Sequence, residues 1–185
     1  TGAFPGGLFF DSSHTWAFME KNGDVRVGID NFLQHVCGSV TRVQIKQPGE
    51  AVKRGDSFLT IIQNGKRLEI KSPVSGVITE QNEVLKDDAS LLNSDPYADG
   101  WILMVKPASW ISELKSYFMG SQYADWLKTE AERLKDFFTS RLKLEQRKET
   151  TLLMQDGGEI NAGVLEAFGP AVWEEFQEGF IDKAK

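Results

Sequence analysis

The sequence has one cysteine and no long hydrophobic run, and each scarcity excludes a class of protein. Cys37 alone cannot form an internal disulfide, which argues against a disulfide-stapled secreted domain and a cysteine-rich metal site. No run of about 18 apolar residues occurs, so no segment is expected to span a membrane. The first residues also lack the basic-then-apolar layout of a signal peptide. The expected location is therefore the cytoplasm.

Groups for metal binding and catalysis are also scarce. His14 and His35 are the only histidines, and no carboxylate or cysteine flanks them at the spacing of metal ligands. We therefore expect no metal site. No Gly-x-Ser-x-Gly motif occurs, and Cys37 has no base near it in the sequence, so we expect no catalytic residues and no enzyme. We interpret Cys37 as a small packing residue at the end of a short helix.

Charge sets limits on the partners. The 185-residue chain has a net charge of −6, which argues against nucleic acid and anionic membrane surfaces. Lys66, Arg67 and Lys71 nevertheless make one short stretch basic. One interpretation is a solubilising loop, and the other is a salt-sensitive electrostatic docking point for a protein partner.

The first part of the chain has the pattern of a small all-β domain. Residues 8–28 read as strands, residues 40–80 alternate strand and turn at intervals of roughly ten, and residues 101–105 form a last strand. A short helix is predicted over 30–36, with Asp30 at its N-cap. These signals predict a sandwich or barrel of small sheets.

The composition changes after Pro107, where helical periodicity begins. Amphipathic segments predict helices over 110–118, 121–146 and 161–168, and a last helix begins at Gly169-Pro170. Thr150 to Met154 is a candidate strand. We therefore divide the chain into a linker (1–7), a β domain (8–107) and a mostly helical extension (108–185). The extension is expected to pack on itself, on the β domain or across a homodimer, through Leu127, Leu134, Phe138, Trp173 and Phe176.

The most informative stretch is 61–76, which predicts two short strands joined by Asn64-Gly65. Both residues tolerate the positive φ that a type I′ turn needs, so Asn-Gly between apolar strands is a strong hairpin signal. A second turn follows from Pro73 to Gly76. The sequence therefore places Asn64 and Gly65 at an exposed hairpin tip.

This stretch resembles the modification hairpin of biotinyl/lipoyl carrier domains, and the chain is most similar to the H protein of the glycine cleavage system. The resemblance covers roughly 8–110 and rests on several blocks in order: His14-Thr15-Trp16, Gly23 to Ile29, Pro48 to Asp56, Pro73 to Ile78 and Leu91 to Trp101. It implies a flattened β-barrel of the biotinyl/lipoyl type. The expected fold class is thus mainly β, with an α appendage.

The hairpin tip departs from the family pattern. The resemblance implies a lipoyl lysine eight residues before the proline of Pro-Val-Ser-Gly, and this position is Gly65, one residue from Lys66. A slip of one residue turns a side chain to the opposite face of a strand. The Met-Lys-Met of biotin carriers is absent as well.

This departure leads to the expected function. We expect no cofactor and an interaction or scaffold module without a swinging arm, which contacts an unidentified protein partner through Asn64, Gly65, Lys66, Arg67 and Lys71. The alternative is a lipoyl carrier that shuttles an aminomethyl or acyl group on a lipoylated Lys66.

Overall fold

The computed structural model describes residues 6–140 and 162–184. The strands in these residues form two antiparallel sheets. The six-stranded sheet has the order β1 (Phe9–Asp11), β2 (Thr15–Met19), β3 (Val25–Ile29), β9 (Leu103–Pro107), β8 (Gly76–Gln81) and β5 (Ala51–Val52). The three-stranded sheet has the order β4 (Arg42–Ile45), β6 (Ser57–Gln63) and β7 (Lys66–Lys71).

The two sheets enclose one apolar core, and the expected flattened β fold of the biotinyl/lipoyl type is confirmed. Val27 and Ile29 from the six-stranded sheet belong to the same buried cluster as Ile61, Leu68 and Ile70 from the three-stranded sheet. All residues of β6 after Ser57 are buried. Burial of both faces of β6 explains why apolar side chains lie at adjacent positions in 58–59 and 61–62.

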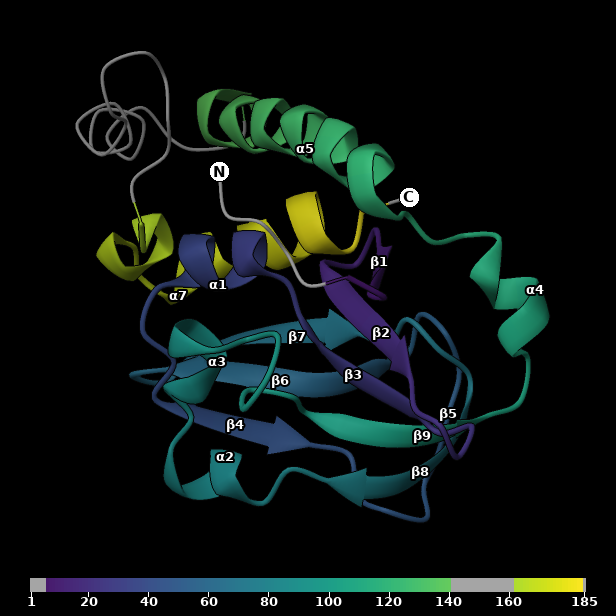
Figure 1. Cartoon of the computed structure of the whole chain (residues 1–185). Helices are drawn as coiled ribbons and strands as arrows, with labels where there is room; N and C mark the ends of the chain where they lie inside the picture. Colours follow the sequence, from purple (N-terminus) through teal and green to yellow (C-terminus); the bar gives the residue numbers. More distant parts are fainter. Residues whose placement is uncertain (1–5, 141–161, 185) are drawn as a thin grey trace.

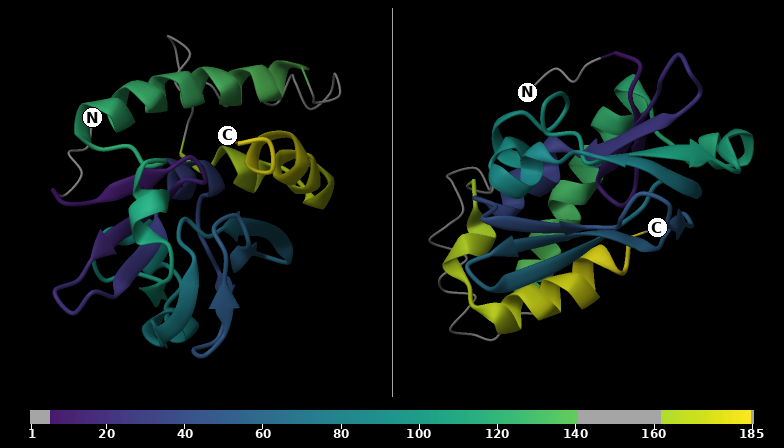
Figure 2. Two further views of the ribbon diagram at one scale, coloured as in Figure 1. Left: turned by 90° about the vertical axis from the view of Figure 1, so that its right-hand side faces the viewer. Right: turned by 90° about the horizontal axis from the view of Figure 1, so that it is seen from below.

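Helices form a layer on one side of the sheets. In Figure 1, α5 (Gly120–Ser140) runs across the top, with α1 (Asn31–Cys37) and α7 (Pro170–Phe176) between it and the strands. The turned views in Figure 2 show the same layering. Three short helices lie elsewhere: α2 (Val84–Asp87), α3 (Leu91–Ser94) and α4 (Trp110–Leu114). No helix among the described residues is long and apolar enough to cross a membrane.

Several local predictions are confirmed. Asp30 is the N-cap of α1, and its Oδ1 accepts a hydrogen bond from the Leu33 N–H at 2.8 Å. Pro170 opens α7, where the missing N–H of proline costs no helical bond. The helix then continues as η2 (Gln177–Ile181), a short π-helical turn. The two helix starts were visible in the sequence because a local residue type sets each of them.

The predicted helix over 110–118 is too long, because α4 ends at Leu114. Phe118 instead pairs with β1, and its N–H donates to the Phe10 carbonyl oxygen at 2.7 Å. The Tyr117 hydroxyl donates to the Pro73 carbonyl oxygen at 2.5 Å. Tertiary contacts thus pull the chain out of the helix that its periodicity favours.

The predicted helix over 161–168 is reduced to η1 (Val164–Ala167), a single 3₁₀ turn. Gly163 precedes it with φ at +70°, and the Gly163 N–H donates to the His35 carbonyl oxygen at 2.6 Å. This bond fixes a left-handed residue before η1, so no regular helix can lead into it. The last residues of the predicted 121–146 helix and the candidate strand at 150–154 lie outside the described residues.

Candidate functional site

The β6–β7 hairpin has the turn that its sequence predicts. Gln63 pairs with Lys66 across the turn, and Asn64 and Gly65 occupy its tip with φ of +49° and +84°. Both tip residues are exposed. Two consecutive positive φ values are the mark of a type I′ turn, which is why Asn-Gly closes this hairpin tightly.

Lys66 is held by the C-terminal part of the chain. Its Nζ donates to the carbonyl oxygens of Glu166 at 3.0 Å and Phe168 at 2.9 Å. The same ammonium lies 5.2 Å from the centre of the Trp173 ring, a cation–π distance. Burial lowers the pKa of Lys66 below its ordinary value, against the opposing charge of Glu166. The ammonium of Lys66, a predicted docking residue, is thus already bound by residues of its own chain.

The other predicted contact residues divide between two surroundings. The Lys71 Nζ lies 3.7 Å from the Asp182 carboxylate and faces the C-terminal segment, as Lys66 does. Arg67 is exposed on the other side of the hairpin, and its Nη2 donates to the Gln44 side chain on β4 at 2.7 Å. The structure therefore brings Asn64, Gly65 and Arg67 to the free surface and places Lys66 and Lys71 against residues 162–184.

The C-terminal segment is fixed to the β domain by further polar contacts that the sequence did not reveal. The Gln177 side chain accepts a hydrogen bond from the Glu69 N–H at 2.7 Å and donates to the Glu69 carbonyl at 3.0 Å. The Glu166 carboxylate accepts a hydrogen bond from the Ser39 N–H. No local sequence pattern predicts these contacts, because each joins residues more than a hundred positions apart.

His14 forms a second connection between the helices and the β domain. Its Nδ1 lies 2.8 Å from Asp30 Oδ2, and its Nε2 lies 2.6 Å from Glu130 Oε2. The Tyr123 hydroxyl also donates to Asp30 Oδ2, at 2.7 Å. All four side chains are buried. From the sequence, His14 was not expected to be a metal ligand. In the structure it has a structural role, because it links the β domain to Glu130 in the middle of α5.

The charges of this network shift the pKa values of its members. Burial by itself lowers the pKa of His14, but the charge and hydrogen bond of Asp30, with those of Glu130, outweigh burial and raise it to about 9. Burial by itself raises the pKa of Glu130, but hydrogen bonds from His14 and Arg133 outweigh it and lower the pKa to about 2. His14 is therefore an imidazolium at neutral pH, held between two carboxylates.

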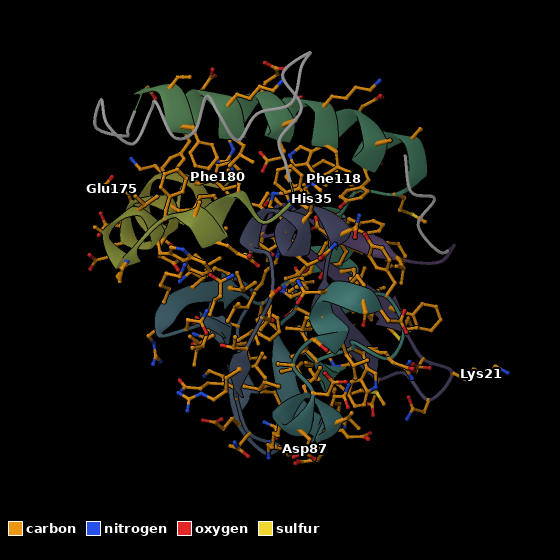
Figure 3. The ribbon with its side chains drawn as sticks, turned by 90° about the vertical axis from the view of Figure 1, so that its left-hand side faces the viewer. Lys21, His35, Asp87, Phe118, Glu175 and Phe180 are labelled. Carbon is orange, nitrogen blue, oxygen red and sulfur yellow. The ribbon has the colours of Figure 1, made fainter. Side chains whose placement is uncertain are left out.

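Arg133 extends the network to the C-terminal segment. It donates to both Glu130 oxygens, at 2.7 and 3.0 Å, and to the Phe180 carbonyl oxygen at 2.8 Å. Its guanidinium carbon also lies 3.7 Å from the centre of the Phe180 ring. Figure 3 shows Phe180 between η2 and α5. The two C-terminal helical parts are thus joined to each other as well as to the β domain.

Cys37 has a structural explanation. Cys37 is buried at the end of α1, and burial raises the pKa of its thiol. This agrees with its interpretation as a small packing residue. Within residues 6–140 and 162–184, no cluster of three or more histidine, cysteine or acidic side chains could hold a metal ion.

Comparison with known proteins decides the family. The family model described as "Glycine cleavage H-protein" matches residues 8–130. The chain belongs to the glycine cleavage H-protein family. A probable glycine cleavage system H protein of Thermococcus kodakarensis is 36% identical over 123 residues, which are 66% of this chain and 91% of that protein. The glycine cleavage system H protein of Stenotrophomonas maltophilia is 34% identical over 126 residues, 68% of this chain and 95% of that protein.

A solved structure supports the same conclusion. The crystal structure of the glycine cleavage system H protein from Mycobacterium marinum matches with a TM-score of 0.58 and 27% identity. The match covers 68% of this chain and 99% of that one. The family match ends at residue 130, so the segment 162–184 that covers Lys66 lies beyond it.

The family match overturns the expected absence of a cofactor. H proteins normally carry lipoate, and the match extends the resemblance to curated H proteins of archaea and bacteria. The prediction of a protein without a cofactor is therefore wrong for the family to which this chain belongs. Lys66 is the lysine next to the hairpin tip, and its Nζ is bonded to the carbonyls of Glu166 and Phe168.

Proposed function

We propose that this chain is a non-catalytic docking protein of a glycine-cleavage-type system. Membership of the H-protein family supports a role among the proteins of that system. The observation that carries the proposal is the hairpin end, where Asn64 and Gly65 are exposed at a rigid turn. Arg67 is exposed beside them, with its guanidinium anchored to Gln44.

The charge of this end indicates the kind of surface that it meets. Arg67 presents a cation on a chain of net charge −6, so the partner surface should be acidic. An exposed charge contact of this kind is weakened by salt, because the Debye length falls to about 8 Å at physiological ionic strength. Docking through Arg67 should therefore weaken as salt is raised.

A binding experiment tests this docking role. The other glycine-cleavage proteins of the same organism are immobilised, and binding of wild type and of Arg67→Glu is measured at low and high salt. We expect the substitution to reduce binding and to remove most of its salt dependence. Lys21→Glu is the matched control, since Lys21 is exposed at the β2–β3 turn, away from the hairpin. Equal binding by the wild type and Arg67→Glu would refute the docking surface.

The second candidate function is a lipoyl carrier, with the group on Lys66. The observation that favours it is the family match over residues 8–130, together with the position of Lys66 beside the hairpin tip. The carrier would pass an aminomethyl or acyl group between enzymes. Intact mass measurement of the protein from its native host tests this, with Lys66→Arg as the control. A mass increase by one lipoyl group that is absent from Lys66→Arg would establish the carrier.

Two further assignments belong to the same proposal. We propose that the β domain ends at residue 107 and that residues 108–185 form the helical extension. We also propose that the chain forms a homo-oligomer through its C-terminal helices. Light scattering over a range of protein concentrations tests this second point, and a monomer at all concentrations would contradict it.

A further inference from the structure

The surroundings of the Lys66 ammonium form a cage built by residues outside the family match. Two carbonyl oxygens, of Glu166 and Phe168, lie 3.0 and 2.9 Å from Nζ, and the Trp173 ring closes a third side. Trp173 is buried, and its Nε1 donates to the Leu165 carbonyl oxygen at 2.9 Å. The ring and the carbonyls of η1 are therefore held in fixed positions relative to each other.

We propose that η1 and the start of α7 act as a lock in cis that binds the free ammonium of Lys66, so that acylation of Lys66 and closure of the lock exclude each other. The inference goes beyond the proposed docking function and does not depend on it. It concerns amide formation at one nitrogen, whichever acyl group is transferred.

The exclusion follows from the chemistry of the nitrogen. A lysine ammonium carries a positive charge and three N–H donors. An acylated lysine is a neutral amide with a single N–H, so it cannot donate to both carbonyls and has no cation to place over the indole. One carbonyl would be left without its donor. Nζ is therefore free to react with an acyl donor only after its bonds to the two carbonyls have opened.

Contacts outside the cage decide which part must move. The α7–η2 helix is fixed to β7 by the paired Gln177–Glu69 hydrogen bonds and by buried aromatic side chains. The η1 turn is fixed by the Glu166 carboxylate at the Ser39 N–H and by the Gly163 N–H at the His35 carbonyl. Its buried Val164 and Leu165 side chains and the Leu165 carbonyl at the Trp173 indole also hold it. Freeing Nζ therefore means separating it from the Glu166 and Phe168 carbonyls, while the Gln177–Glu69 bonds keep η2 on β7. The lock is thus η1 with the start of α7, and not the whole extension.

Chemical acetylation of the full chain tests the lock. Wild type is treated with a limiting amount of the N-hydroxysuccinimide ester of acetic acid, and the rate at each lysine is followed by peptide mass spectrometry. We expect Lys66 to react at least about tenfold more slowly than the exposed Lys21, the difference expected when charge-assisted hydrogen bonds must break first. Equal rates at the two lysines would overturn the proposal. Figure 3 shows Lys21 projecting from the β domain, far from the C-terminal helices.

A variant that loosens η1 makes the test specific. Glu166→Ala removes the carboxylate that binds the Ser39 N–H, without touching the core, because Glu166 is exposed. We expect it to raise the rate at Lys66 toward that of Lys21. Glu166→Gln removes the same charge but keeps an oxygen that can accept from the Ser39 N–H, so its rate should stay closer to that of the wild type. Glu174→Ala, an exposed position on α7, should leave the rate unchanged. A Lys66 rate in Glu166→Ala equal to that of the wild type would contradict the lock.

Hydrogen exchange gives a second readout in case Glu166→Ala disturbs folding. Lys66→Gln replaces the ammonium with a neutral amide, as acylation does. We expect faster exchange at the amides of Glu166 and Phe168, which are bonded within η1. Lys66→Arg keeps the charge and should show a smaller change. Unchanged exchange in Lys66→Gln would refute the lock, and it would leave the docking role of Arg67 unaffected, since neither experiment uses a binding partner.

Discussion

His14 Nε2 lies 2.6 Å from Glu130 Oε2, although 116 positions separate the two residues in sequence. Both side chains are buried, and the opposite ring nitrogen of His14 binds Asp30, the N-cap of α1. One imidazolium therefore connects the β domain, α1 and α5. This network is a buried polar link between the long helix and the sheets.

Removal of Glu130 should destabilise the protein strongly. Glu130→Ala leaves His14 with one carboxylate instead of two and deprives Arg133 of its partner on α5. Breaking a buried ion pair typically costs about 3–5 kcal/mol, because the remaining charge stays buried without compensation. Urea unfolding measures the change. Glu132→Ala on the exposed face of α5 is the control and should change the free energy of unfolding by about 0.5 kcal/mol or less.

The same network predicts a loss of stability in alkali. Folding raises the pKa of His14 from 6.5 to about 9, so the protonated form favours the folded state. Its contribution is full below pH 6.5, decreases as pH rises and is lost above about 9. The total is roughly 3 kcal/mol for a shift of this size. The pKa of Tyr97 is raised to about 12, so this phenol stays neutral in the same range.

The measurement compares the free energy of unfolding at pH 6 and pH 10 for wild type and His14→Asn. Asparagine tolerates the left-handed backbone that His14 adopts at φ +62° and does not titrate. The variant should lose less stability than the wild type between the two pH values. An equal loss in both proteins would show that other groups cause the effect.

Truncation should distinguish the roles of the two helical parts. A chain ending at Pro107 loses Tyr123, which is stacked on Phe10 with ring centroids 3.7 Å apart, and also loses Glu130. Each large apolar side chain uncovered costs roughly 1.5–3 kcal/mol, so this chain should melt at a lower temperature and aggregate more readily. A chain ending at Ser140 keeps both residues. Its melting temperature should lie between those of the full chain and of the chain ending at Pro107. If the chain ending at Pro107 melts at the same temperature as the full chain, the extension is an independent unit.

Gly65→Ala should strain the hairpin tip without a steric clash. An added Cβ meets no atom within 4 Å, but φ is +84°, a conformation that residues with a Cβ rarely adopt. The expected loss is about 1–2 kcal/mol in the free energy of unfolding. Gly6→Ala, also with open space but without a positive φ, should cost less. A cost at Gly65 no greater than at Gly6 would contradict this account of the turn.

Local residue preferences explain the parts of the fold that could be predicted. Asn64-Gly65 closes the hairpin because both residues accept positive φ. Asp30 and Pro170 mark helix starts, because Asp30 accepts a hydrogen bond from a free N–H of the first turn and Pro170 has no N–H to leave unbonded. The resemblance in ordered blocks then identified the flattened β fold. These signals depend on neighbours within a few positions, so they can be read along the chain.

The sequence by itself determined the β domain, its hairpin tip and the apolar faces of the C-terminal helices. Only the tertiary structure decided where those helices lie, that α4 ends early, and that Lys66 is bound by carbonyls about a hundred residues away. The physical reason is that a backbone carbonyl or a buried carboxylate has no sequence signature for its partner. Which groups meet is settled when the apolar faces pack, since packing brings Lys66 to η1 and His14 to Glu130.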